Sequence, residues 1–145
     1  MRIPRGRRTV TGLYTLDILF VERDPHVRAL GTEFLAAAGH RVELAQDGQE
    51  ALEKIRAHKP DLVLCEILVP KLDGLALCRQ LKANPETRDV LVLVQTILAA
   101  SARASEAGAD GFLLKPLAQH RLIAMVQDLV EKRSPSARLH VQERS

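Results

Sequence analysis

The stretch from residue 60 to residue 70 reads Pro60-Asp-Leu-Val-Leu-Cys-Glu-Ile-Leu-Val-Pro70, so that after Asp61 a single charged residue, Glu66, interrupts an apolar run. A strand that is apolar without alternation is typical of a parallel sheet that helices cover on both faces. Besides residues 62–67 of this stretch, four short runs rich in Val, Ile and Leu are predicted as strands, at residues 16–21, 42–45, 90–94 and 111–114. The pattern predicts a five-stranded parallel sheet.

Stretches with helical periodicity lie between these runs. One face of a helix collects Val27, Leu30, Phe34 and Leu35, and another, near the end of the chain, collects Leu122, Met125, Val126 and Leu129. Asp24 before Pro25 is a typical helix start, with a capping side chain followed by proline in the first turn. The alternation of strands and helices predicts an α/β fold, a doubly wound (βα)₅ sandwich with right-handed crossovers.

The ends of the chain differ in charge from its body. The first twelve residues carry four arginines and no acid, whereas the body between residues 13 and 130 has a net charge of −3 in a chain that totals +3. We therefore predict one folded domain over residues 15–133, a disordered basic extension over residues 1–14 and a disordered tail over residues 134–145. Cys65 and Cys78 lie in apolar patterns without metal-binding spacing, which indicates reduced, buried thiols in a cytoplasmic protein. No apolar run is long enough to span a bilayer.

Charged and hydroxyl side chains follow four of the predicted strands. In open α/β sheets, function is located beyond the carboxyl ends of the strands, which share one edge of the sheet. The residues expected at that edge are Glu22, Arg23, Asp24, Glu66, Thr96 and Lys115, with Pro116 next in the chain. Each alone is unremarkable, since charged residues often flank strands. Their joint occurrence predicts a functional site.

Three stretches resemble the receiver domain of bacterial two-component response regulators. They are Ile18-Leu-Phe-Val-Glu-Arg-Asp-Pro25, the stretch 60–70 followed by Asp73-Gly74, and Gly108-Ala-Asp-Gly-Phe-Leu-Leu-Lys-Pro116. The resemblance covers residues 16–132. It implies a flavodoxin-like fold with a parallel sheet of strand order 2-1-3-4-5.

The resemblance also implies a role for each residue at the edge. In that family, acids after the first strand and an aspartate after the third hold Mg²⁺, and a histidine kinase donates a phosphoryl group to that aspartate. The matching positions are Glu66 for the phosphoacceptor, Glu22, Arg23 and Asp24 for the acidic pocket, Thr96 and Phe112 for the switch residues, Lys115 for the phosphoryl-binding lysine and Pro116 for a cis-proline. A cis bond before Pro116 needs tertiary support, because only about 5% of such bonds are cis.

Two positions depart from the family pattern. Glu66 is longer than aspartate by one methylene, which moves its carboxylate outward by about 1.5 Å, and phosphoryl transfer depends on positions held to within about 1 Å. Arg23 puts a cation where Mg²⁺ wants an oxygen ligand. We therefore predict a degenerate magnesium site, with weak or absent Mg²⁺ binding and no other cofactor. The permanent charge of Glu66 would imitate a phosphoryl group in part.

Two arrangements of the pocket are open from the sequence. In one, Arg23 pairs with Glu66 and Glu22, Thr96 loses its partner and Phe112 stays outward; in the other, Glu66 reaches Thr96 and Lys115, and Phe112 turns inward. We predict the first, because arginine suits fork-like pairing with carboxylates and ionic hydrogen bonds are the stronger ones. For Arg23, the alternative to pairing is that it points to solvent and the site is vacant. For Asp24, capping of the helix is favoured over a role as metal ligand.

These predictions favour a pseudo-receiver, which is not an enzyme and signals by binding a protein such as a histidine kinase or an output protein. A homodimer is also open. The expected partner face comprises the alanine-rich helix 98–107, which we predict to be mobile, the last strand and the last helix, with Arg103, Phe112 and Arg121 as its test residues. The first alternative is a working phosphoacceptor receiver, modified on Glu66 or Asp24. The second is nucleic-acid contact through the N-terminal arginines, which lack aromatic interleaving and rank last.

Overall fold

The computed structural model of the protein describes residues 7–8 and 14–133 of the chain. Its main sheet has five parallel strands in the order β4-β3-β5-β6-β7, which is 2-1-3-4-5 along the domain. The strands are β3 (Asp17–Val21), β4 (Arg41–Ala45), β5 (Leu62–Cys65), β6 (Leu91–Thr96) and β7 (Gly111–Leu114). The predicted fold class and strand order are confirmed.

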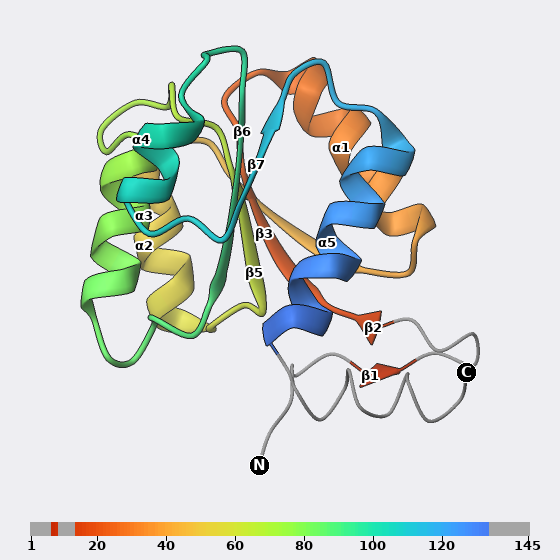
Figure 1. Ribbon diagram of the computed structural model, residues 1–145, viewed down its shortest axis with the longest axis horizontal. Coiled ribbons are helices and arrows are strands. Elements are labelled where there is room, and N and C mark those ends of the chain that lie inside the picture. Colours follow the sequence, from red (N-terminus) through yellow and green to blue (C-terminus); the bar gives the residue numbers. More distant parts are fainter. Residues whose placement is uncertain (1–6, 9–13, 134–145) are drawn as a thin grey trace.

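In the part of the chain that the structure describes, five helices cover the sheet. They are α1 (Pro25–Ala37), α2 (Gly48–Ala57), α3 (Gly74–Ala83), α4 (Ser101–Glu106) and α5 (Gln119–Arg133). Helices α1 and α5 lie on one face of the sheet, and α2, α3 and α4 lie on the other (Figure 1). Each face has its own apolar cluster, so the central strands β3, β5 and β6 are buried on both sides. This explains the continuous apolar runs of β5 and β6.

Local signals fix where three of the helices begin. The side chain of Asp24 accepts hydrogen bonds from the N–H groups of His26 and Val27, at 2.8 and 3.3 Å, and caps α1. Asp47 and Asp73 cap α2 and α3 in the same manner. A capping side chain satisfies a backbone donor that the first turn of a helix leaves unpaired. The caps of α1 and α3 lie next to the carboxyl ends of β3 and β5 and thus border the site.

Helix α4 differs from the other four. It has six residues and no side-chain cap, and alanines provide its buried contacts: Ala100, Ala104 and Ala107. The prediction placed a helix over residues 98–107, and the observed helix is shorter at both ends. Small side chains bury little apolar area, so the helix gains little from packing.

A two-residue strand, β1 (Arg7–Arg8), pairs antiparallel with β2 (Tyr14–Thr15) before the main sheet begins. The predicted disorder of residues 1–14 and 134–145 concerns residues that lie mostly outside the described part of the chain, and it stays a prediction. Within the described residues, no helix has the length and apolar character needed to cross a membrane.

Candidate functional site

The predicted edge residues gather at the carboxyl ends of the parallel strands. Glu22 follows β3 and Glu66 follows β5, and the register pairs their preceding residues, Val21 and Cys65. Thr96 ends β6 and lies beside Leu114, after which Lys115 leaves β7. Glu22 and Glu66 are only 1% and 4% exposed, and Thr96 is fully buried. Two carboxylates are therefore buried side by side, which requires compensation by donors or cations.

Lys115 supplies that compensation by bridging the two carboxylates. Its Nζ lies 2.9 Å from Oε1 of Glu22 and 2.8 Å from Oε1 of Glu66. Burial acts to lower the pKa of Lys115, but the hydrogen bonds and charges of Glu66 and Glu22 outweigh it and raise that pKa. Burial likewise acts to raise the pKa of Glu66, and hydrogen bonds from Lys115, Thr96 and the Leu68 backbone hold it below its usual value. The ammonium of Lys115 and the carboxylate of Glu66 therefore each favour the charged form of the other.

Further donors occupy the remaining oxygens of the two carboxylates. The Leu68 N–H donates to Oε2 of Glu66 at 2.9 Å, and the Asp24 N–H donates to Oε2 of Glu22 at 3.0 Å. Gln95, which is fully buried on β6, donates from Nε2 to Oε1 of Glu22 at 2.8 Å. The sequence reasoning missed Gln95. Its signal was a polar residue inside an apolar strand, one position before Thr96.

The prediction that Arg23 pairs with Glu66 is wrong. Arg23 is exposed, and within the described residues its guanidinium has neither an ion-pair nor a hydrogen-bond partner. Lys115 follows β7 and reaches past the end of β6 to Glu66, whereas the side chain of Arg23, between β3 and α1, is exposed. Arg28 reinforces that turn, because its Nη1 donates to the carbonyl oxygens of Glu22 and Arg23 at 3.0 and 3.1 Å.

Glu66 therefore adopts the second of the two arrangements considered from the sequence, in which its partners are Lys115 and Thr96. Phe112 is partly buried and packs against the apolar cluster beneath α2, α3 and α4, together with Leu98. The predicted outward position of Phe112 stays a prediction, because its side chain is neither fully buried nor fully exposed. The Lys115–Pro116 peptide bond is cis.

Glycine at position 74 brings α3 against the site. A Cβ atom at Gly74 would lie 2.3 Å from the backbone oxygen of Glu66, which no real contact allows. The Gly74 N–H donates to the carbonyl of Ile67 at 2.9 Å. The backbone around Glu66 is thus held between the start of α3 and the end of β5. Any side chain at position 74 would displace it.

The arrangement of the pocket bears on whether it could hold a divalent cation. Mg²⁺ needs free oxygen ligands in near-octahedral order. Here an ammonium lies between Glu22 and Glu66, every oxygen of the two carboxylates accepts a hydrogen bond, and Asp24 caps α1. Across residues 7–8 and 14–133, no cluster of three or more His, Cys, Asp or Glu side chains is arranged to hold a metal.

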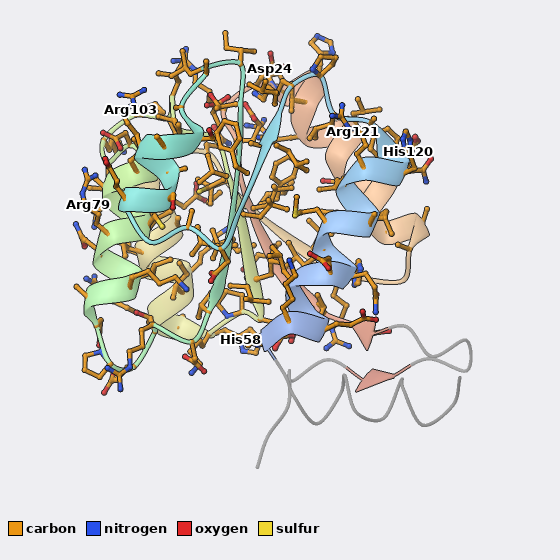
Figure 2. The ribbon with its side chains drawn as sticks, in the orientation of Figure 1. Asp24, His58, Arg79, Arg103, His120 and Arg121 are labelled. Atoms are coloured by element: carbon orange, nitrogen blue, oxygen red, sulfur yellow. The ribbon has the colours of Figure 1, made fainter. Side chains whose placement is uncertain are left out.

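Next to the pocket, a mixed apolar and basic surface surrounds β7, the edge strand of the sheet. Ile97 and Leu114 are 68% and 51% exposed at the ends of the paired strands β6 and β7. Arg103 on α4 and Arg121 on α5 lie to either side of β7, and both are exposed (Figure 2). The predicted test residues Arg103, Phe112 and Arg121 therefore border one strand. We call Ile97, Arg103, Phe112, Leu114 and Arg121 the β7 surface.

Comparison with known proteins places most of the chain in one family. The model of the response regulator receiver domain matches residues 18–127. The response regulator MprA of Mycolicibacterium vanbaalenii is 39% identical over 119 residues, which are 81% of this chain and 52% of that protein. The chain thus spans about half the length of the curated relatives it matches.

Two solved receiver structures share the fold. The signal receiver domain of a histidine kinase from Syntrophus aciditrophicus has 34% identity and a TM-score of 0.76, covering 81% of this chain and 92% of that one. The receiver domain of the sensor histidine kinase PA1611 from Pseudomonas aeruginosa has 26% identity and a TM-score of 0.74, covering 80% of this chain and 98% of that one. That second structure holds a magnesium ion coordinated in its active site cleft.

Proposed function

The chain belongs to the family of response regulator receiver domains, which are signalling modules of two-component systems, and we propose that it is a pseudo-receiver that a partner protein reads without phosphorylation. The single observation that carries this proposal is the bridge of Lys115 between Glu22 and Glu66. In this proposal the lysine ammonium is the resident cation of the pocket. It leaves no free oxygen for Mg²⁺ and no free carboxylate to attack a phosphoryl donor.

Three features of the pocket support the absence of phosphoryl transfer. The carboxylate at the acceptor position belongs to Glu66 and is only 4% exposed, which hinders in-line approach of a phosphoryl donor. Its two oxygens are bound by Lys115 and by the Leu68 N–H. Arg23 adds an exposed positive charge where the family pattern has an acid. Since phosphoryl transfer relies on metal ions to neutralise developing charge, the pocket lacks the electrostatic means for it.

The same contacts support a fixed conformation. Thr96 and Lys115 both contact the Glu66 carboxylate, and in receivers these are the two positions expected to contact a phosphoryl group. Glu66 carries one negative charge, and a phosphoryl group carries about −1.5 to −2 at neutral pH, so the likeness is partial. We propose that the domain is held permanently in this one arrangement, with no switch between two states.

The proposed partner is a protein of the same signalling system, a histidine kinase or an output protein, bound at the β7 surface. Exposed apolar side chains at Ile97 and Leu114 with Arg103 and Arg121 nearby have the mixed composition of a protein interface. Arginine is also among the residues that most often carry binding energy. We place this interaction in the cytoplasm, in keeping with the free, buried thiols of Cys65 and Cys78. No enzymatic activity is proposed.

Intact-mass spectrometry after incubation with acetyl phosphate and Mg²⁺ tests this function. A receiver with the full set of acids serves as the positive control, and it gains one phosphoryl group under the same conditions. The chain is expected to keep its mass. A gain of one phosphoryl group that hydroxylamine removes would show an acyl phosphate on Glu66 or Asp24. That result would replace the pseudo-receiver with the working phosphoacceptor.

A further inference from the structure

Gln95 is a polar side chain in a strand that is apolar up to that position. Strand β6 reads Leu91-Val-Leu-Val-Gln-Thr96, and Gln95 is completely buried in it. Its amide reaches across the end of β5, which lies between β6 and β3, to donate to Glu22 at 2.8 Å. The opposite orientation of the amide would set its oxygen against a carboxylate oxygen. The contact with Glu22 therefore requires the amide nitrogen as donor.

The other end of the amide has no partner. Within the described residues, Oε1 of Gln95 is buried and accepts no hydrogen bond. An unpaired buried carbonyl carries the full cost of its lost hydration, which an aliphatic side chain of similar size would not incur. Gln95 is thus unfavourable for packing at one end and bound to the functional pocket at the other. The favourable interaction of the Gln95 amide is its hydrogen bond to Glu22.

Glu22 receives two donors on one oxygen. Both Lys115 Nζ and Gln95 Nε2 contact Oε1, at 2.9 and 2.8 Å, while Oε2 accepts the N–H of Asp24. A carboxylate oxygen has two lone-pair directions, and the two donors fill both of them on Oε1. The carboxylate is consequently fixed in rotation. Its oxygen faces the lysine and has no lone pair left for a metal.

We infer that Gln95 is the positioning residue that holds Glu22 on Lys115, so that the lysine and not a divalent cation bridges the two carboxylates. This inference rests on the proposed pseudo-receiver function and names the residue that maintains it. The single variant Arg23→Asp, which restores an acid, should then still bind metal poorly. A second substitution that removes the Gln95 amide frees one lone pair of Glu22 for a cation.

Mn²⁺ titration followed by electron paramagnetic resonance tests this inference in the 145-residue chain. The signal measures the free Mn²⁺ ion, and the amount of bound Mn²⁺ is the total minus the free amount. No assay of activity is needed. The compared variants are Arg23→Asp and the double variant Arg23→Asp/Gln95→Met, with Gln95→Leu as a second form of the same change. The double variant is expected to bind Mn²⁺ about tenfold more tightly, equivalent to about 1.4 kcal/mol. Arg23→Asp/Gln127→Met is the matched control, since Gln127 donates its amide to Glu131 on α5.

The side-chain ¹⁵N signal of Lys115 gives an independent readout. A buried, bridged ammonium exchanges its protons slowly and is visible by NMR. In Gln95→Met that signal should broaden or shift, whereas Gln127→Met should leave it unchanged. The urea midpoint of Gln95→Met should not fall, because the variant also removes the unpaired Oε1.

The outcomes separate this inference from the function on which it rests. Equal Mn²⁺ affinities of Arg23→Asp and the double variants, with an unchanged Lys115 signal, would leave Gln95 a structural residue only and overturn the inference. Phosphorylation of the parent chain would overturn the pseudo-receiver function, whatever the result for Gln95. A loss of stability in Gln95→Met with unchanged metal affinity counts against the positioning role.

Discussion

Lys115→Met removes the ammonium that bridges two buried carboxylates while keeping a side chain of similar length. Glu22 and Glu66 then face each other without the cation that lies 2.9 and 2.8 Å from them. Breaking a buried ion pair from one side costs about 3–5 kcal/mol, because it leaves an uncompensated buried charge. With a urea slope of about 2 kcal/mol per M, the unfolding midpoint should fall by about 2 M at neutral pH. Far-UV circular dichroism is the appropriate probe, since the chain has no tryptophan and one tyrosine.

The pH dependence of this loss distinguishes a charge effect from a packing effect. In the parent, burial acts to raise the pKa of Glu66, but Lys115 and Thr96 hold it below its usual value. A carboxyl group with a lowered pKa stabilises the fold above its unfolded pKa, and this stabilisation disappears as the pH falls through the folded value. In Lys115→Met burial acts with less opposition, so Glu66 destabilises the fold when it is charged. The deficit relative to the parent should therefore shrink as the solution is made acidic.

Lys59→Met is the matched control for Lys115→Met. Lys59 also makes two contacts, with Asp89 and the Glu86 carbonyl, but on the exposed surface. An exposed pair contributes about 0–1 kcal/mol, so its midpoint should shift by less than about 0.5 M. Equal midpoints for the two variants at neutral pH, or a deficit in Lys115→Met that persists unchanged in acid, would refute the reasoning.

Three other expectations can be checked with the purified chain. Gly74→Ala places a Cβ at 2.3 Å from the Glu66 carbonyl and should cost about 3 kcal/mol by urea unfolding; a parent-like midpoint would mean that α3 moves away freely. Burial raises the pKa of Cys78 to about 11 and that of Cys65 further, so neither thiol should react with Ellman's reagent at pH 8 until the chain is unfolded, and prompt reaction of the native protein would contradict their burial. Arg103→Glu reverses an exposed charge of the β7 surface and should weaken partner binding without changing the urea midpoint; binding that is unaffected would remove α4 from the interface.

Most of the fold follows from periodicity in the sequence. The strand at residues 111–114 was predicted with its observed bounds, and the other four within two residues at each end, because buried parallel strands are continuous apolar runs. The grouping of Glu22, Glu66, Thr96 and Lys115 was also predictable, since parallel strands end at one edge. The positions of the strands and the edge at which they end follow from the order of apolar residues and from the right-handed connections between parallel strands.

The contacts within the pocket were harder to predict. Arg23 and Lys115 both carry the charge that Glu66 needs, and the choice between them depends on the path of the chain after β3, which Arg28 holds. Gln95 and Glu22 are 73 positions apart, and no local pattern joins them. The prediction compared the charge of Arg23 with the neutral hydroxyl of Thr96, and it gave too little weight to Lys115, a cation of the same charge.

The small buried area of α4 determines how readily this helix unfolds locally. A six-residue helix that buries Ala104 and is flanked by Ala100 and Ala107 has little to hold it against local opening. Its amide hydrogens should therefore exchange with solvent far faster than those of β5 or β6. We therefore expect α4 to open separately from the strands that carry the ion-paired pocket. A partner that docks on α4 would be detected as slowed exchange confined to that helix, while the strands keep their rates.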